Sequence, residues 1–243
     1  MLSKIYEGLD GVTLFDSWTQ RREILGAIAA APREETILLL GHGCPWGLLD
    51  MRHGILIGDA DADLLKDRPN LVGIWCYASS YAHKHGLKGF FCGMFISEPR
   101  EAFIHLVEAT PEEIYDKAEN FSINMGLMFR DGYPLEKIAD MMMDPCYIDS
   151  DLTAFNYSRL TWRPEGNEPL PAESDDKDWR GGAVCPLGLV HIPRSISLDA
   201  DPGPNGRGLW RIPGAIGQFG RKTPSIRSDV DKWWSSAICY SAE

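Results

Sequence analysis

The chain has 243 residues, with 24 Lys or Arg against 35 Asp or Glu and a formal net charge of −11. This acidic balance argues against a general nucleic-acid-binding protein, which presents basic surface to phosphate. No apolar run approaches the roughly 18 residues of a membrane span, and the N-terminus lacks the apolar block of a signal peptide. The six cysteines are spread out without a Cys-x-x-Cys motif. We therefore expect a cytoplasmic protein with free thiols and one sizeable core.

The first expected elements form a strand, a helix and a second strand. Val12–Phe15 follows a turn signal and reads as a short strand. A helix over residues 18–31 has its apolar side chains near helical spacing, and Pro32 ends it. The apolar run Ile37–Leu40 is the second strand. This order predicts a β-α-β unit with a right-handed crossover.

The next segment contains a loop and a group of acidic residues. Residues 44–50 are punctuated by Gly and Pro and predict a loop over the end of the second strand, and residues 54–58 predict a small extra strand. The run 59–63 carries three aspartates and imitates the start of a calcium-binding EF-hand loop. However, Leu64 stands where that loop needs Gly, and Asn70 where it needs a bidentate Glu. We interpret these aspartates as acids at a helix N-terminus.

Two further strands complete the expected sheet. Residues 71–75 form an apolar run that ends at Cys76, and a helix then extends to Gly86. Residues 88–96 predict the fourth strand, after which Ser97 caps another helix. Four mainly parallel strands with helices between them predict a doubly wound α/β sheet.

The clearest local signal in the chain is a helix start at residues 110–113. Thr-Pro-Glu-Glu is a capping box with Pro at the first helical position. It predicts a helix over residues 112–129, with one apolar stripe formed by Ile114, Ala118, Phe121, Met125 and Met128. A short helix over 135–143 follows, and we interpret its methionines as core side chains, in preference to metal ligands.

The character of the sequence changes beyond Trp162. Proline and glycine occupy 19 of the 81 positions in residues 163–243, and periodicity becomes hard to find. We therefore divide the chain into an α/β domain over residues 1–160 and an irregular C-terminal appendage over 161–243. The sequence leaves three interpretations of this appendage open: a loop-rich addition, a partly disordered tail, or a segment translated out of its native frame.

Two residues able to do chemistry follow neighbouring strands of the expected sheet. Ile37–Leu40 leads into Gly41-His42-Gly43, and residues 71–75 lead into Cys76. In parallel sheets ligands bind beyond the carboxyl ends of the strands. An imidazole and a thiol are therefore expected at one rim, as a cysteine nucleophile and its base require.

This pattern resembles the caspase-like cysteine peptidases of clan CD, in which one hydrophobic strand leads into His-Gly and the next into the nucleophilic Cys. The resemblance covers roughly residues 12–107 and implies a caspase-like fold. It implies acyl transfer on a peptide or protein substrate, with Cys76 as nucleophile, His42 as general acid/base and the Gly43 N–H in the oxyanion hole. It implies no cofactor. The caspase signature Gln-Ala-Cys-x-Gly is absent, so a caspase with aspartate specificity is not expected.

In this clan, specificity comes mainly from the pocket for the residue before the scissile bond. Asp16, Asp50 and Glu98 stand at strand ends or in site loops, and an acidic pocket would favour Lys or Arg. Each of these residues fits a helix cap or a solvated charge equally well.

Three alternatives to the dyad stay open. Cys44 could be the reactive thiol or a redox partner of Cys76. The domain could be a catalytically inactive binding or regulatory module. A metal site is the third alternative, and it draws on the following residues: His42, Cys44, His53, Cys76, His83 and His85. The sequence leaves the oligomeric state open.

Overall fold

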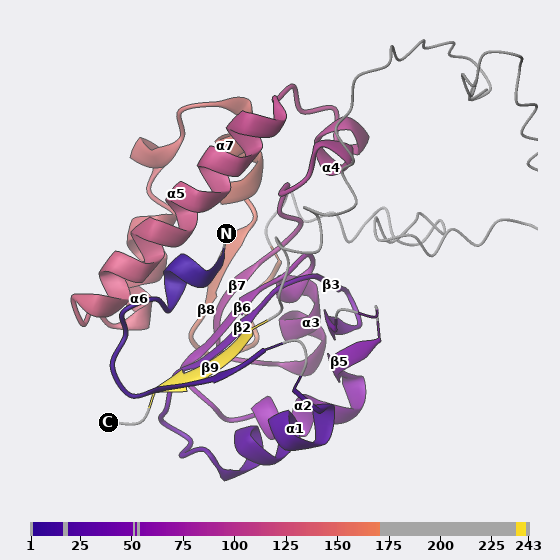
Figure 1. Ribbon diagram of the computed structural model, residues 1–243, viewed down its shortest axis with the longest axis vertical. Coiled ribbons are helices and arrows are strands. Elements are labelled where there is room, and N and C mark those ends of the chain that lie inside the picture. The colour runs from indigo at the N-terminus through magenta and orange to yellow at the C-terminus, as the bar shows by residue number, and fades with distance from the viewer. Residues whose placement is uncertain (1, 17–18, 51, 53, 171–236, 242–243) are drawn as a thin grey trace, which may run out of the picture.

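A twisted β-sheet runs through the middle of the protein, with helices on both of its faces (Figure 1). The computed structural model describes residues 2–16, 19–50, 52, 54–170 and 237–241. Within these residues the sheet has six strands, in the order β1-β9-β2-β6-β7-β8. Their bounds are β1 Val12–Phe15, β2 Ile37–Leu40, β6 Leu71–Ile74, β7 Gly89–Cys92, β8 Leu160–Arg163 and β9 Ala237–Ser241.

The centre of the sheet is parallel and its flanks are antiparallel. Strands β2, β6 and β7 are parallel to one another, whereas β8 pairs antiparallel with β7. Strand β9 is antiparallel to both β1 and β2. Every residue of β2, β6 and β7 is buried, as expected for parallel strands covered on both faces.

The four predicted strands all belong to this sheet, which confirms a mixed α/β fold with a mainly parallel centre. Strand β9 lies between β1 and β2 and is antiparallel to both, so β1 and β2 are parallel, as the predicted β-α-β unit requires, but do not pair directly. The fourth strand ends at Cys92 and not at residue 96, because the backbone bends at Gly93 after the last hydrogen bond of the β7–β8 register, from the Gly93 N–H to the Arg159 carbonyl at 2.8 Å.

The helices lie in two groups on opposite faces of the sheet (Figure 1). Helices α1, α2 and α3 lie on one face, and η1, α5, α6 and α7 on the other. Their bounds, together with those of the remaining helices, are η1 Leu2–Ile5, α1 Arg21–Ala30, η2 Asp59–Asp61, α2 Ala62–Leu65, α3 Ala78–His85, α4 Pro99–Ile104, α5 Pro111–Arg130, α6 Leu135–Met142, η3 Pro145–Tyr147 and α7 Asp151–Tyr157.

The longest helix, α5, follows its prediction closely. The Thr110 side chain accepts a hydrogen bond from the Glu113 N–H at 3.1 Å, and Pro111 is the first helical residue. All five residues of the predicted apolar stripe are buried. In α6, Met142 is also buried, as predicted for a core methionine.

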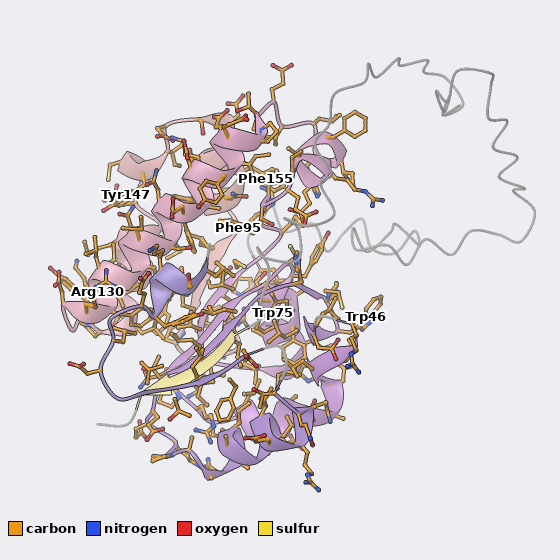
Figure 2. All side chains as sticks on the ribbon, in the orientation of Figure 1. Trp46, Trp75, Phe95, Arg130, Tyr147 and Phe155 are labelled. Atoms are coloured by element: carbon orange, nitrogen blue, oxygen red, sulfur yellow. The ribbon has the colours of Figure 1, made fainter. Side chains whose placement is uncertain are left out.

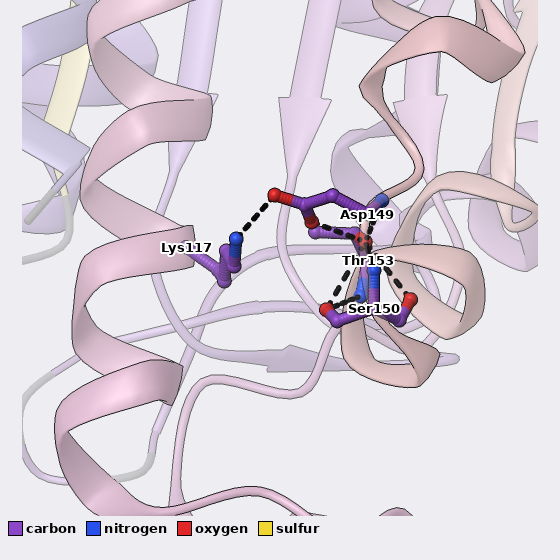
Figure 3. Close-up of polar contacts among 4 residues, drawn as sticks. All are labelled: Lys117, Asp149, Ser150 and Thr153. Carbon is purple, nitrogen blue, oxygen red and sulfur yellow. Dashed lines mark hydrogen bonds and ion pairs between the residues drawn. The ribbon is translucent and has the colours of Figure 1, made fainter.

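Helix α5 is tied to the start of α7 by a polar network (Figure 3). Lys117 on α5 forms an ion pair with Asp149. The Thr153 hydroxyl accepts from the N–H groups of Asp149 and Ser150 at 3.1 and 3.0 Å, and the Ser150 hydroxyl accepts from the Thr153 N–H at 3.2 Å. This reciprocal arrangement is a capping box that fixes where α7 begins.

A second sheet of three short strands stands between β2 and β6 in the sequence. It consists of β3 Gly43–Cys44, β4 Gly47–Leu49 and β5 Ile55–Gly58, all antiparallel. The prediction of β5 is confirmed, whereas the predicted loop over 44–50 is in fact a β3–β4 hairpin. Its tight turn contains Pro45 and Trp46, so the turn signals in the sequence mark the hairpin bend.

Two of the three aspartates of residues 59–63 have structural partners. Asp61 is buried, and both its carboxylate oxygens accept from Arg21 Nη2, at 2.7 and 2.6 Å. Asp59 accepts from Lys84 at 2.6 Å and lies 2.9 Å from His85 Nε2. Asp59 and Asp61 lie in η2, which runs into the short helix α2.

The expected domain boundary after residue 160 falls inside β8, which pairs along its whole length with β7. Strand β9, from the far end of the chain, also belongs to the same sheet. The remainder of the expected appendage, residues 171–236 and 242–243, lies outside the described residues. Among the helices that the structure describes, none is both long and apolar enough to cross a membrane.

Candidate active site

His42 and Cys76 lie at the carboxyl ends of two adjacent parallel strands. Leu40 at the end of β2 pairs with Ile74 at the end of β6, and the Gly41 N–H continues the ladder by donating to the Ile74 carbonyl at 3.0 Å. His42 and Cys76 each follow these paired residues by two positions. The register of the two strands therefore places the imidazole and the thiol level with each other.

A small cavity brings these two residues together. Its volume is about 20 Å³, room for about one water molecule. Leu2 of η1 and Ala118 of α5 contribute to its wall, so elements on one face of the sheet close over it. The remaining wall residues come from the strand ends and the segment after β7, and they are Gly41, His42, Ile74, Trp75, Cys76, Cys92, Phe95 and Ser97.

Two of these wall residues are core side chains. Trp75 lies in the interior, in contrast to Trp46 at the surface (Figure 2). The Cys92 thiol donates to the Trp75 carbonyl at 3.0 Å, and burial raises the pKa of this thiol to about 12. Cys92 is therefore an unreactive core thiol.

Cys76 stands at a sharp bend between β6 and α3. The next residue, Tyr77, has φ 70° and ψ 22°, a left-handed conformation that costs a bulky residue about 1–2 kcal/mol. Its N–H donates to the Gly93 carbonyl at 3.1 Å, which helps to hold the bend. Helix α3 then begins at Ala78, so Cys76 lies between the strand end and the helix N-terminus.

The thiol of Cys76 has two oxygen acceptors on the segment that follows β7. Its Sγ lies 3.6 Å from the Phe95 carbonyl oxygen and 3.9 Å from Oε1 of Glu101. Cys76 is 8% exposed and Glu101 is 2% exposed. The sequence does not predict this contact between Glu101 and the Cys76 thiol.

The sequence does contain a pattern that singles out Glu101, but this pattern predicts a helix cap and gives no indication of a contact with Cys76. Glu101 is the third residue of α4 after Pro99, the position from which a Glu side chain folds back onto the helix N-terminus. Its Oε2 accepts from the N–H groups of Ser97 and Glu98 at 2.7 and 3.0 Å. The helix therefore begins one residue later than predicted, with Glu98 at the N-cap position.

Gly43 lies against the Trp75 indole. A Cβ added to Gly43 would lie 1.9 Å from Trp75 Cδ1, so only Gly fits. The Leu49 N–H donates to the His42 carbonyl at 2.8 Å, which makes His42 and Leu49 a hydrogen-bonded pair. Because such pairs alternate in antiparallel ladders, the Gly43 N–H points away from β4. Gly43 itself is not among the residues that line the cavity.

The three predicted acidic liners do not contribute to the cavity wall. Asp16 is exposed, and its Oδ1 accepts from the Thr19 N–H and hydroxyl, both at 3.1 Å. The Asp50 carboxylate organises the β4–β5 turn by accepting from the N–H groups of residues 52 and 54, both at 2.8 Å. Glu98 is half-buried at the start of α4, and burial raises the pKa of its carboxyl.

The other described thiols and imidazoles do not line the cavity, apart from Cys92. Cys44 is buried in β3, and Cys146 is an exposed free thiol. His83 Nδ1 lies 3.2 Å from the Glu168 carbonyl oxygen, whereas His85 faces Asp59. His53 lies outside the described residues. Within the described ranges, no three His, Cys, Asp or Glu side chains gather closely enough to hold a metal ion.

Comparison of the chain with protein-family models, with curated proteins and with solved structures finds no match.

Proposed function

We propose that the chain is a cytoplasmic cysteine endopeptidase of the caspase-like type, with Cys76 as nucleophile and His42 as general acid/base. One observation carries this proposal: the imidazole and the thiol follow paired residues of adjacent parallel strands and line one cavity. Nucleophile and base on neighbouring strand ends are the arrangement that covalent acyl transfer needs. Cys92 and Cys146 carry free thiols, as is usual in a reducing compartment.

The reaction would proceed through an acyl-enzyme, with His42 accepting and returning a proton in each half. The Cys76 Sγ attacks the scissile carbonyl carbon while its proton passes to His42. The carbonyl oxygen gains negative charge, and the Gly43 N–H donates a hydrogen bond to it. His42 then gives the proton to the leaving amine, the C–N bond breaks, and an acyl-enzyme remains. Water activated by His42 hydrolyses the thioester and restores the thiol.

The substrate class follows from the same proposal. A peptide or protein chain is the substrate of this chemistry, and no cofactor takes part. The net charge of −11 makes nucleic acid an unfavourable partner.

The test measures the reactivity of the Cys76 thiol. Purified protein is treated with iodoacetamide from pH 5 to 10, and the adduct is located by mass spectrometry. We expect rapid labelling at Cys76 below the pH near 8.5 at which a free thiol ionises, loss of that adduct in Cys76→Ala, and slower labelling in His42→Ala. Cys92→Ala is the matched control, because Cys92 lines the same cavity and should leave the rate unchanged.

A peptide library then tests for turnover. Cleavage that is lost in both Cys76→Ala and His42→Ala supports the peptidase. Labelling of Cys76 no faster than a free thiol, together with no cleavage of the library by folded protein, would overturn the proposal.

A second candidate function is a catalytically inactive binding module of the same fold. The observation that favours it is the size of the cavity, which at about 20 Å³ admits no peptide side chain. A peptidase must therefore open this region to bind substrate, whereas a binding module need not. Slow labelling at Cys76 would favour the module.

A further inference from the structure

The segment that follows β7 supplies both oxygen acceptors of the Cys76 thiol. Phe95 contributes a backbone carbonyl at 3.6 Å, and Glu101 contributes a carboxyl oxygen at 3.9 Å. The two acceptors are close together in the sequence, within seven residues of each other. This segment therefore offers the Cys76 S–H group two acceptors.

The Glu101 carboxyl is held in place by its other oxygen. Oε2 accepts three hydrogen bonds, from the Ser97 N–H at 2.7 Å, the Ser97 hydroxyl at 3.0 Å and the Glu98 N–H at 3.0 Å. These donors fix the rotation of the carboxyl group, so Oε1 stays directed at Cys76. Ser97 also lines the cavity that contains His42 and Cys76.

We propose that Glu101 is a positioning residue for Cys76, which orients the thiol and restrains its ionisation through the contact between Oε1 and Sγ. This inference rests on the proposed function of Cys76 as nucleophile. A carboxylate accepts the S–H hydrogen bond, but it repels a thiolate at the same distance. Loss of the thiol proton to His42 is therefore less favourable while Glu101 carries its charge.

The surroundings of the carboxyl support this role. Burial raises the pKa of Glu101 to about 7, and the charge of Glu98 raises it further, while the Ser97 and Glu98 donors oppose both effects. Glu101 Oε1 and Cys76 Sγ are 3.9 Å apart, close enough for a charge on one group to oppose ionisation of the other. Other titratable or charged groups of the described chain around this pair are His42 and Cys92 in the cavity wall, Glu98 on α4, and Arg159, which stacks on Phe155 beside Cys76.

The experiment measures how the labelling rate of Cys76 depends on pH in Glu101→Gln. The amide keeps the size of the carboxyl and can donate a hydrogen bond to sulfur, but it carries no charge. We expect the midpoint of the labelling profile to fall by about one pH unit or more, which is roughly tenfold more thiolate at pH 7. A purely structural role for Glu101 would leave the midpoint unchanged, and an unchanged or higher midpoint overturns the proposal.

A second variant keeps the test valid if Glu101→Gln does not fold. Ser97→Ala removes one donor to Oε2, which favours the protonated carboxyl, and should lower the midpoint by a smaller amount in the same direction. An unchanged or raised midpoint in folded Ser97→Ala would also contradict the proposal.

The result is separable from the test of the dyad. If His42→Ala leaves labelling unchanged while Glu101→Gln shifts the midpoint, the dyad fails and the Glu101 contact stands. If His42→Ala slows labelling and Glu101→Gln has no effect on the midpoint, only the role of Glu101 fails.

Discussion

Gly43 lies directly against Trp75, at a point where a Cβ atom would be 1.9 Å from the indole Cδ1. The Gly47 carbonyl oxygen, at 2.8 Å from the same Cβ position, closes the space from another side. The residue after His42 must therefore be Gly for a steric reason, in addition to any role of its N–H in the reaction.

Substitution Gly43→Ala should destabilise the protein by about 1–3 kcal/mol, the usual cost of forcing an extra methyl group into a packed core. It should also slow the labelling of Cys76, because displacement of Gly43 shifts the adjacent His42 relative to the thiol. Chemical denaturation gives the free energy of unfolding. In a Trp75→Leu background the same substitution should cost less, and equal costs in the two backgrounds would contradict the steric explanation.

Gly126 forms a similar close contact between α5 and the N-terminal turn η1. A Cβ at Gly126 would lie 2.1 Å from the Lys4 carbonyl oxygen, so Gly126→Ala should push η1 off the helix. We expect a loss of about 1–3 kcal/mol in the free energy of unfolding. Because Leu2 of η1 lines the cavity, labelling of Cys76 should become faster.

Gly26 in α1 is the matched control for this prediction. Its added Cβ would have no atom within 4 Å, so Gly26→Ala should stabilise the protein by about 0.5–1 kcal/mol, as expected for a helix interior. Equal changes in the free energy of unfolding for Gly126→Ala and Gly26→Ala would show that the close contact between Gly126 and η1 does not affect stability.

In the network that joins α5 to α7, substitution of Thr153 should reduce the stability of the protein most (Figure 3). It is buried, and its hydroxyl accepts from the backbone N–H groups of Asp149 and Ser150. Thr153→Ala leaves both donors without this acceptor and should cost about 1–2 kcal/mol. Thr153→Ser keeps the hydroxyl and should cost less. Lys117→Met removes a partly exposed ion pair worth about 0–1 kcal/mol, and thermal denaturation that reversed this order would contradict the prediction.

The parts of the fold that the sequence predicts are those coded by local pattern. Short apolar runs that end in Gly41 or Cys76 predict the buried strands β2 and β6, and their parallel pairing follows from the crossover between them. Strand β9 could not be placed in the same way, because its pairing with β1 and β2 joins distant parts of the chain. Sequence spacing carries no information about which strand edge such a segment meets.

In the candidate site, too, only the residues marked by a local sequence pattern could be predicted. His42 and Cys76 could be found because each directly follows a strand, whereas Glu101 meets the thiol only through the fold. Asp16 and Asp50 show the opposite error: strand-end acids were considered for a specificity pocket, and in the structure they accept backbone hydrogen bonds in turns. Short-range hydrogen bonding to the backbone is the common use of Asp at such positions.

The buried carboxyl of Glu101 should also make stability depend on pH. Its pKa is raised from an ordinary value of 4.5 to about 7 in the folded protein, mainly by burial. Between these two values the folded state binds more protons than the unfolded state, so the contribution of Glu101 is fully present below pH 4.5 and is lost as the pH rises through 7. Relative to Glu101→Gln, the wild-type protein should lose about 3 kcal/mol at most across this window.

Asp59→Asn is the control with the opposite sign. A hydrogen bond from Lys84 lowers the pKa of Asp59, so its stabilising contribution is present above the ordinary pKa of 3.8 and is lost as the pH falls through the lower folded value. Denaturation curves from pH 4 to 8 should therefore show the wild-type protein and Glu101→Gln diverging with rising pH, whereas Asp59→Asn should run parallel to the wild type above about pH 5. Parallel curves for Glu101→Gln would mean that the carboxyl is ionised in the folded protein without cost, and that its charge is already compensated by the three donors at Oε2.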